Sequence, residues 1–212
     1  MTDFIEVFNQ NNIRITAEVG RIYIDPFQMK IEPKDAAFVL ITHDHMDHFS
    51  PEDLEKVICA DTIMVVPAAM ADKAQPYETK VKQIVTVTPN EKTEIEGLPI
   101  ETVPAYNKLK PFHPRSSGWV GYILTVNGQR VYIAGDTDAT DEAKAVTCDI
   151  ALVPIGGTYT MDVKKAAELI NSMKPKVAIP VHFGGIVGKP EDADTFAELV
   201  DAPTEVVKKI QF

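Results

Sequence analysis

Hydrophobic residues along this chain fall mostly into short runs, which favour β-strands over long helices. These runs predict strands at residues 4–8, 13–18, 21–25, 36–42, 62–67, 83–88, 98–104, 119–126, 130–135, 150–154, 176–181 and 204–212. The pair Asn127-Gly128 predicts a type I′ hairpin turn, because both residues tolerate positive φ angles. The chain is therefore expected to be rich in β-sheet.

Fewer segments have the spacing of an amphipathic helix. Residues 50–58 begin with Ser50 as the expected N-cap and a proline at the first helical position. Residues 160–173 carry apolar residues at helical spacing behind Thr160 as the expected cap, and residues 189–200 and 68–75 complete the set. No linker or repeat interrupts this order, so we expect one α/β domain over residues 1–212, with two sheets covered by helices.

Composition narrows the classes of function. The chain has 212 residues, 45% of them hydrophobic, with a net charge of −10, which disfavours nucleic-acid binding because phosphates require a basic face. The N-terminal segment lacks the basic start of a signal peptide, and no apolar run is long enough for membrane insertion. Cys59 and Cys148 are isolated and form no disulfide framework, so a cytoplasmic protein is expected.

Three of the five histidines lie within six positions, in the segment HDHMDH at residues 43–48. The segment connects a predicted strand to a predicted helix. His43 and His45 are two residues apart where the strand ends, so both imidazoles can face one way. Asp47 and His48 follow in the turn and can serve a second ion. Mixed histidine and carboxylate ligands suit Zn²⁺, with Mn²⁺ or Fe as alternatives.

Two further polar residues stand at the ends of predicted strands, namely Asp136 and His182. The carboxyl ends of parallel strands meet at one edge of a sheet, where separate segments build one site. A carboxylate between two ions about 3.5–4 Å apart can bridge them, and Asp136 suits that role. The alternatives are a capping role for Asp136 and a core position for His182.

The motifs THDHMDH, AGDT and PVHF, in this order and at these separations, resemble those of metallo-β-lactamase-fold hydrolases. The resemblance covers nearly the whole chain. The segments VPAYN, GWVGYILTVNGQRVYIAGDTD and VPIGGTYTM are similar to the branch that contains L-ascorbate-6-phosphate lactonase and N-acyl-phosphatidylethanolamine phospholipase D. The resemblance implies an αββα four-layer sandwich, two mixed β-sheets flanked by helices, with a binuclear metal site on one edge.

The resemblance also implies a set of ligands for two ions. The first ion would be held by His43, His45 and a further histidine, and the second by Asp47, His48 and His182, with Asp136 as the bridge. Two ions that share a water lower its pKa and hold a hydroxide as the nucleophile, and the resemblance implies that Asp47 is the orienting base and proton shuttle. The expected enzyme is a binuclear metal-dependent hydrolase without a covalent intermediate.

The further histidine is where this chain departs from the family pattern. Relatives commonly place it at the end of the strand that matches residues 101–107, where this chain has Asn107. The remaining histidine is His113, in a loop stiffened by Pro111 and Pro114. We expect His113 to fold back and supply the ligand. In the alternative, Asn107 or water completes a weaker site.

A charge asymmetry surrounds His113. Residues 102–135 contain no Asp or Glu, although the chain has 31 of them. Lys108, Lys110 and Arg115 flank His113, so we expect a basic rim that attracts a small anionic ester, lactone or phosphodiester. A solvated loop without a specific role is the alternative.

Other residues near the expected site have two interpretations each. Tyr106 and Trp119 could line the pocket or belong to the core. Gly156, Gly157 and Tyr159 precede a predicted helix, where backbone N–H groups could bind an anion or form an ordinary turn. The candidate substrate contacts are Tyr106, Asn107, Lys108, Lys110, Arg115 and Tyr159.

Two other classes of function stay open. A non-catalytic metal-binding or sensing protein on the same fold is compatible with Asn107 in place of the usual histidine. A redox di-iron protein is disfavoured, because relatives of that kind carry Glu where this chain has His45. Both a monomer and a homo-oligomer are compatible with the sequence.

Overall fold

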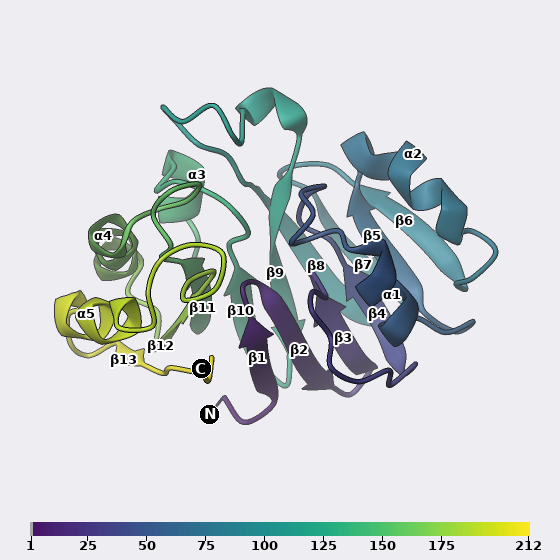
Figure 1. Ribbon diagram of the computed structural model, residues 1–212, viewed down its shortest axis with the longest axis horizontal. Coiled ribbons are helices and arrows are strands. Elements are labelled where there is room, and N and C mark those ends of the chain that lie inside the picture. The colour runs from purple at the N-terminus through teal and green to yellow at the C-terminus, as the bar shows by residue number, and fades with distance from the viewer. Residues whose placement is uncertain (1) are drawn as a thin grey trace.

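The computed structural model describes residues 2–212, and its two β-sheets pack face to face (Figure 1). The first sheet contains, in spatial order, β1 (Ile5–Asn9), β2 (Asn12–Ala17), β3 (Gly20–Ile24), β4 (Ala36–Leu40), β5 (Ile63–Pro67) and β6 (Gln83–Val87). The second contains, in spatial order, β13 (Glu205–Val206), β12 (Val177–Val181), β11 (Ile150–Pro154), β10 (Gln129–Ile133), β9 (Val120–Val126), β8 (Leu98–Pro104) and β7 (Lys92–Ile95).

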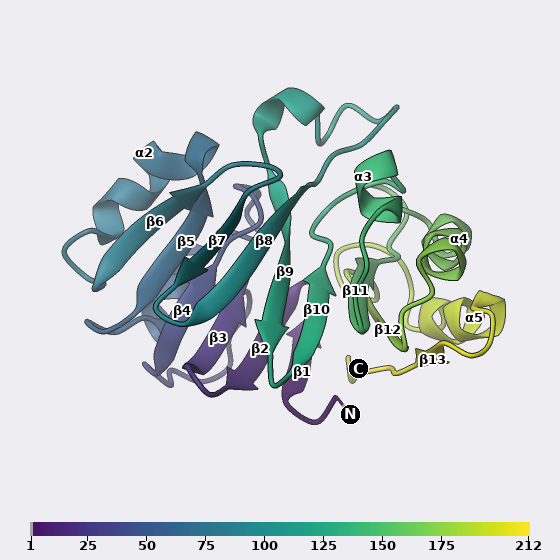
Figure 2. The same cartoon turned by 180° about the vertical axis from the view of Figure 1, so that it is seen from behind.

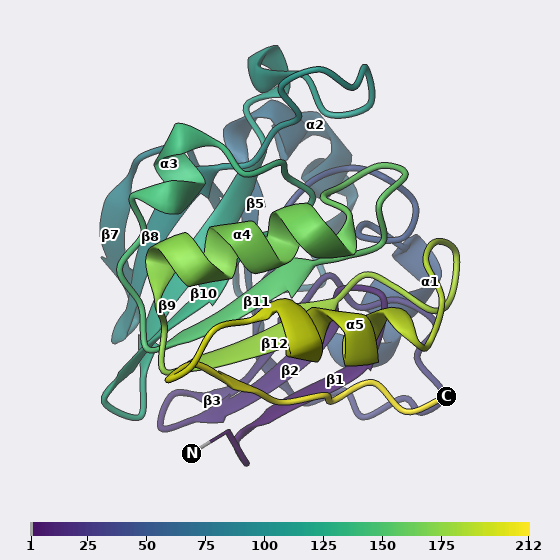
Figure 3. The ribbon, with the colours of Figure 1, turned by 90° about the vertical axis from the view of Figure 1, so that its left-hand side faces the viewer.

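Helices cover the outer faces of both sheets, as the views from behind (Figure 2) and from the side (Figure 3) show. The first sheet carries α1 (Pro51–Val57) and α2 (Ala71–Ala74), with the 3₁₀ turns η1 (Ala68–Met70) and η2 (Gln75–Tyr77). The second carries α3 (Asp141–Lys144), α4 (Val163–Met173) and α5 (Asp192–Leu199), and η3 (Arg115–Ser117) lies between β8 and β9. The four-layer αββα sandwich and its two mixed sheets are therefore confirmed. None of the helices within residues 2–212 has the length and hydrophobicity to cross a lipid bilayer.

Three apolar clusters hold the four layers together. The largest lies between the sheets and includes Ile13 and Leu124, both fully buried. A second joins the outer face of the second sheet to α4 through Leu169, and a third joins the first sheet to α1 through Leu54. Each fully buried Leu or Ile side chain contributes about 1.5–3 kcal/mol, so the sandwich is held mainly by these layers.

Most predicted strands are confirmed, as is the β9–β10 hairpin, where Asn127 and Gly128 have φ angles of 51° and 70°. The prediction missed β7, an edge strand of four residues in which Ile95 is the one apolar residue. It was wrong for most of residues 204–212, of which two residues pair with β12. Val207 and Ile210 there pack against the core, and the N–H of Val207 donates to the carbonyl of Ala178 in β12 at 3.0 Å.

Helix starts agree in part with the predictions. Ser50 caps α1 as expected. Thr160 as the cap of α4 is wrong, because the helix begins at Val163 and the Asp162 side chain accepts the N–H of Lys165 at 2.9 Å. The prediction also missed α3, capped by Thr140, because one turn of helix has no measurable periodicity.

Asp53 fastens α1 to the connection between β3 and β4. Its carboxylate accepts the backbone N–H groups of Gln28 and Met29, both at 2.8 Å. The Ser50 hydroxyl and the Lys56 ammonium donate to it as well, at 2.7 and 3.0 Å. Burial raises the pKa of Asp53, but these hydrogen bonds outweigh burial and lower the pKa below its ordinary value.

Replacing Asp53 by Ala is expected to reduce the free energy of unfolding at neutral pH by about 2 kcal/mol, since hydrogen bonds to a charged group are lost. The folded-state pKa lies below the unfolded one, so this contribution is present above the unfolded pKa and disappears as pH falls through the folded pKa. Urea unfolding at neutral pH and at about pH 3 measures it. Glu52→Ala, at an exposed neighbour, is the control. An equal loss at both pH values would contradict the assignment.

Candidate metal centre

Three strand ends and one loop bring the predicted ligands to one edge of the sandwich. The HDHMDH segment follows β4, Asp136 lies just after β10, and His182 comes directly after β12. His113 belongs to the loop between β8 and β9. This loop runs at the top of Figure 1. Because β10, β11 and β12 are parallel, their carboxyl ends share this edge, as the sequence predicts.

A close approach of the two sheets brings His43 and Asp136 together. Gly135 has a φ angle of 62°, and a Cβ atom there would lie 3.2 Å from the Cβ of Thr42. The Thr42 carbonyl accepts the N–H of Val120 from the other sheet at 3.2 Å. The residues that follow Thr42 and Gly135 are His43 and Asp136, so this contact joins two ligands across the sandwich.

A tight turn folds the HDHMDH segment back on itself. The N–H of His48 donates to the carbonyl of His45 at 3.0 Å. The imidazole of His48 consequently returns beside that of His43, with ring centroids 3.9 Å apart. Asp44 points the other way and forms an ion pair with Lys73.

Asp136 lies at the centre of the cluster, with 3% of its side chain exposed. Its Oδ2 is 3.3 Å from the Nε2 atoms of both His113 and His182. The Nε2 of His43 lies 3.9 Å from Oδ2, and that of His48 lies 3.4 Å from Oδ1. Burial raises the pKa of Asp136, but the charges of His182 and His48 outweigh burial and hold the pKa well below its ordinary value. The carboxylate is therefore ionised among four imidazoles.

The donor atoms form three overlapping groups, each with atoms within 4.8 Å of one another. Their members are His43, His45 and His113; His43, His48 and Asp136; and Asp47, His48 and His182. We call the first the His113 group and the third the Asp47 group. The structure thus brings together all seven residues that the sequence nominates as ligands.

Buried atoms without partners indicate that a cation fits here. Within residues 2–212, the Nε2 atoms of His43, His48, His113 and His182 and the Oδ1 of Asp136 are buried without a hydrogen bond. Each such atom costs about 1–3 kcal/mol. Imidazole nitrogens and carboxylates aimed at one place are the ligands that Zn²⁺ and related ions bind. The residues therefore fit a metal centre.

The histidines of the cluster differ in protonation state. Burial and the neighbouring His48 hold the pKa of His43 well below its ordinary value, so its imidazole is neutral. Burial also lowers the pKa of His182, but Asp136 and Asp47 outweigh burial and raise it to about 9. A metal ion that binds His182 must displace a proton from it.

Asp25, which the sequence analysis missed, orients two of the histidines. Its Oδ2 lies 2.7 Å from the Nδ1 of His48 and accepts the Thr42 hydroxyl at 2.6 Å. The Thr42 hydroxyl oxygen is 2.9 Å from the Nδ1 of His43. With both Nδ1 atoms engaged, the Nε2 atoms face the cluster. Asp25 follows β3, so the strand-end signal that identifies Asp136 was present for it too.

The loop after β8 folds back so that His113 reaches the cluster. The Asn107 side-chain nitrogen lies 3.1 Å from the Nδ1 of His113 and donates to the carbonyl of Tyr159 at 2.7 Å. The backbone N–H of Asn107 donates to the carbonyl of His113 at 2.7 Å. Lys110 ties the same loop to the Gly157 carbonyl at 3.1 Å. Asn107 therefore lies behind His113, on the side away from Asp136.

Each basic residue of the expected rim has an acidic neighbour. The pairs are Lys108 with Asp141 at 3.2 Å, Lys110 with Asp138 at 3.5 Å, and Arg115 with Glu142 at 2.6 Å. All three acids follow shortly after the acid-free stretch of residues 102–135, and the fold places them opposite it. The rim is therefore balanced in charge, which the count along the sequence did not reveal.

The aromatic candidates occupy different surroundings. Tyr106 donates its hydroxyl to Glu142 of α3 at 2.9 Å. Tyr159 packs edge-on against Phe112, with ring centroids 4.8 Å apart. Trp119 packs against all three members of the His113 group, with centroid distances of 5.0–5.5 Å. Among these aromatic residues, Trp119 is therefore the one against the metal ligands.

The two glycines after β11 have roles in packing. A Cβ atom at Gly156 would lie 2.3 Å from the carbonyl oxygen of His182, so only a glycine lets the loop approach this residue. The N–H of Gly157 donates to the carbonyl of Met161 at 3.0 Å. That N–H is already engaged, which argues against the anion-binding interpretation of Gly157.

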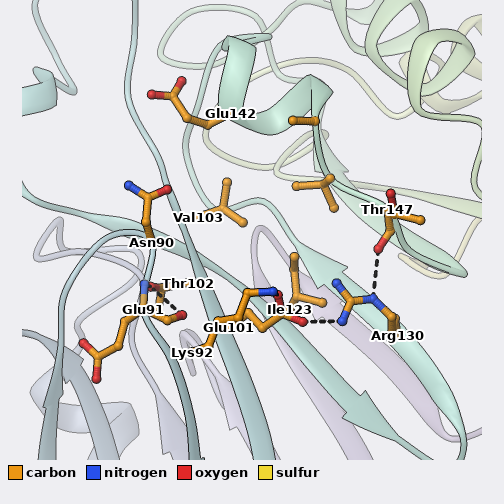
Figure 4. Close-up of a pocket in the computed structure, with 12 residues that line it drawn as sticks. Asn90, Glu91, Lys92, Glu101, Thr102, Val103, Ile123, Arg130, Glu142 and Thr147 are labelled. Carbon is orange, nitrogen blue, oxygen red and sulfur yellow. Dashed lines mark hydrogen bonds and ion pairs between the residues drawn. The ribbon is translucent and has the colours of Figure 1, made fainter.

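A separate cavity of about 440 Å³ lies beside α3 on the outer face of the second sheet (Figure 4). Its lining includes Glu101 and Arg130, which form an ion pair, and Arg130 also donates to the carbonyl of Thr147 at 3.0 Å. Its lining contains none of the seven clustered residues, so it is distinct from the metal centre.

Known proteins share both the sequence and the architecture. The family described as "Beta-lactamase superfamily domain" matches residues 5–182. A UPF0173 metal-dependent hydrolase from Pyrococcus abyssi is 32% identical over 202 residues, which covers 88% of each chain. A solved structure from Parabacteroides distasonis, described as a metal-dependent hydrolase, has a TM-score of 0.79 at 30% identity and covers 98% of this chain and 93% of that one. The metallo hydrolase Igni18 from Ignicoccus hospitalis has a TM-score of 0.74 at 22% identity, covers 98% of this chain and 95% of that one, and supports the fold alone.

Proposed function

This chain belongs to the β-lactamase superfamily of metal-dependent hydrolases, and we propose that it hydrolyses a small anionic ester, lactone or phosphodiester with two divalent cations. His43, His45 and His113 would hold one cation, and Asp47, His48 and His182 the other, with Asp136 between them. The ligand set favours Zn²⁺, with Mn²⁺ and Fe as alternatives. The observation that carries the proposal is the set of four buried Nε2 atoms around Asp136, unpartnered within residues 2–212.

The two carboxylates of the cluster suit different tasks. Two divalent cations bound here would lower the pKa of a shared water and polarise the scissile group. The Asp47 side chain is 14% exposed and that of Asp136 is 3% exposed, so Asp47 is the one that can exchange a proton with substrate and solvent. We assign the movement of the proton to a carboxylate oxygen of Asp47, and the fixed negative charge to Asp136.

Two exposed members of the rim support an anionic substrate. Lys108 and Arg115 lie at the surface, with 42% and 66% of their side chains exposed, and Asp141, the partner of Lys108, is 90% exposed. Exposed ion pairs contribute little stability. A substrate anion can therefore replace the carboxylate beside the basic side chain at a small cost in free energy. Lys110 is held by backbone carbonyls, and its role is to hold the His113 loop.

Turnover by the zinc-loaded protein tests the proposed function. We expect hydrolysis of at least one member of a panel of lactones, esters and phosphodiesters, loss of turnover on chelation, and recovery with added metal. The KM for the anionic substrate should rise with ionic strength, because salt screens the attraction of Lys108 and Arg115 for the anion, while that of a neutral analogue stays constant. A protein that binds zinc but turns over no member of the panel would favour the alternative, a metal-binding or sensing protein.

Zinc content of two variants tests the third ligand of the first ion. His113→Ala removes a ligand, so bound zinc is expected to fall from two ions per chain to one. Asn107→Ala removes the side-chain hydrogen bond that ties the His113 loop to the Tyr159 carbonyl, and about a 10–100-fold weaker affinity is expected with both sites still fillable. Elemental analysis after dialysis, together with zinc titration, measures both effects. The opposite ranking of the two variants would mean that Asn107 completes the site.

We also propose a reducing, cytoplasmic location. Cys59 and Cys148 are both free thiols. Burial raises the pKa of Cys148 to about 12, which makes this thiol unreactive. Two unpaired cysteines are typical of proteins from a reducing compartment.

A further inference from the structure

The turn between β1 and β2 is a run of four amide residues, NQNN at positions 9–12. Gln10, Asn11 and Asn12 are buried, with 2%, 1% and 0% of their surface exposed. Buried polar side chains need hydrogen-bond partners. Those of Gln10 and Asn11 lie at the metal centre.

Gln10 contacts two members of the Asp47 group. Its side-chain Nε2 donates to the Oδ2 of Asp47 at 3.2 Å, and its backbone carbonyl accepts the backbone N–H of His182 at 2.8 Å. Gln10 and His182 both have left-handed φ angles, 40° and 56°. Residues other than glycine rarely adopt this conformation and keep it when their surroundings hold them there. The turn therefore holds the side chain of Asp47 and the strained backbone of His182, which both belong to the Asp47 group.

Asn11 supports the remaining member of the group. Its Nδ2 donates to the Oδ2 of Asp25 at 2.7 Å, and that same oxygen lies 2.7 Å from the Nδ1 of His48. The register of β1 against β2 shifts between Val7 and Asn9. Such a bulge redirects the residues that follow it, here towards the cluster.

The contacts of Gln10 reach the ligands of one proposed ion. Across residues 2–212, no hydrogen bond of Gln10 reaches His43, His45 or His113. We infer that Gln10 is a positioning residue that sets the affinity of the Asp47 group for its ion and leaves the His113 group unchanged. This inference rests on the proposed binuclear site. The physical reason is that the side-chain amide of Gln10 fixes the orientation of the Asp47 carboxylate. The backbone carbonyl of Gln10 fixes the backbone that presents His182.

Zinc titration of Gln10→Met and Gln10→Asn tests the inference. Met keeps the length of the side chain and removes the donor. Asn tolerates the left-handed backbone but is one methylene too short to reach Asp47. Each variant is expected to bind one Zn²⁺ with wild-type affinity and the other about 10–100-fold more weakly, measured by competition with a chromophoric chelator. Anomalous scattering at the zinc edge, from crystals grown at limiting zinc, is expected to show the ion in the His113 group.

Two controls separate this effect from general damage. Asn127→Ser alters the β9–β10 hairpin turn, where Asn127 has a φ angle of 51° and donates to the Thr16 carbonyl, and it should bind both ions as the wild type does. His113→Ala should show the reciprocal loss. Equal weakening of both ions, unchanged affinities, or loss of the ion from the His113 group would overturn the inference. A wild type that binds two ions without turnover refutes the proposed hydrolase and leaves the inference standing, whereas a wild type that binds fewer than two ions refutes both.

Discussion

Replacing Asp47 by Asn is expected to reduce turnover about 10²–10⁴-fold, the range for loss of a proton-transferring group. Burial raises the pKa of Asp47, but the nearby His182, whose Nε2 lies 3.3 Å from the Asp47 Oδ2, and the charge of His48 outweigh burial, so the pKa lies below its ordinary range. The carboxylate is thus ionised and able to accept a proton at neutral pH. An amide has nearly the same shape but cannot accept one, so kcat is expected to fall more than KM changes.

Asp44→Asn is the matched control for this substitution. Asp44 lies in the same segment and undergoes the same chemical change, but its side chain pairs with Lys73 outside the cluster. Wild-type turnover is expected for it. Steady-state kinetics and zinc content should be measured on both variants, because loss of the ion would also reduce turnover. An Asp47→Asn enzyme with full zinc content and turnover within a few-fold of wild type would remove Asp47 from proton transfer.

Asp25→Ala is expected to have the largest effect on stability and to weaken both ions. Asp25 is fully buried and accepts four hydrogen bonds, from Asn11, His48 and both the N–H and the hydroxyl of Thr42. Removing the acceptor leaves buried donors unpaired, at a cost of about 3–5 kcal/mol. In a domain of this size, that corresponds to a melting temperature lower by about 10 °C.

Affinity for zinc should fall together with stability in this variant. Asp25 orients His48 directly and His43 through Thr42, so it serves both ions, whereas Gln10 serves one. About a 10–100-fold loss is expected for each ion. Calorimetry of the metal-free protein separates the loss of stability from the loss of affinity. Glu32→Ala is the control, since Glu32 lies on the same β3–β4 connection and is 63% exposed. An unchanged melting temperature without metal would show that Asp25 does not hold the fold.

Much of the candidate site could be predicted because its residues are marked by local pattern. His43, Asp136 and His182 each lie just after an apolar strand, and such strand ends meet at one edge of a sheet. His113 was found by elimination, as the remaining histidine. Its actual position depends on the contacts of Asn107 and Lys110 with the loop after β11, which no pattern in the loop itself indicates.

Other features could not be predicted because their partners are distant along the chain. Gln10 and Asn11 read as an ordinary polar turn, yet they are buried against Asp47 and Asp25. The rim reads as basic, because its acidic partners lie beyond the stretch that was counted. Thr160 and Asp162 are both good caps, and the helix begins behind Asp162.

By itself, the sequence determined which chemical groups are present and which strand each one follows, since strand periodicity and the spacing of the HDHMDH segment are properties of neighbouring residues. Only the tertiary structure decided which atoms face one another. The four imidazoles around Asp136, the acids opposite the basic loop and the amide turn beneath Asp47 are all contacts between the two sheets or between distant loops. Their distances follow from how closely the sheets pack, which is set by the whole core and not by any single segment.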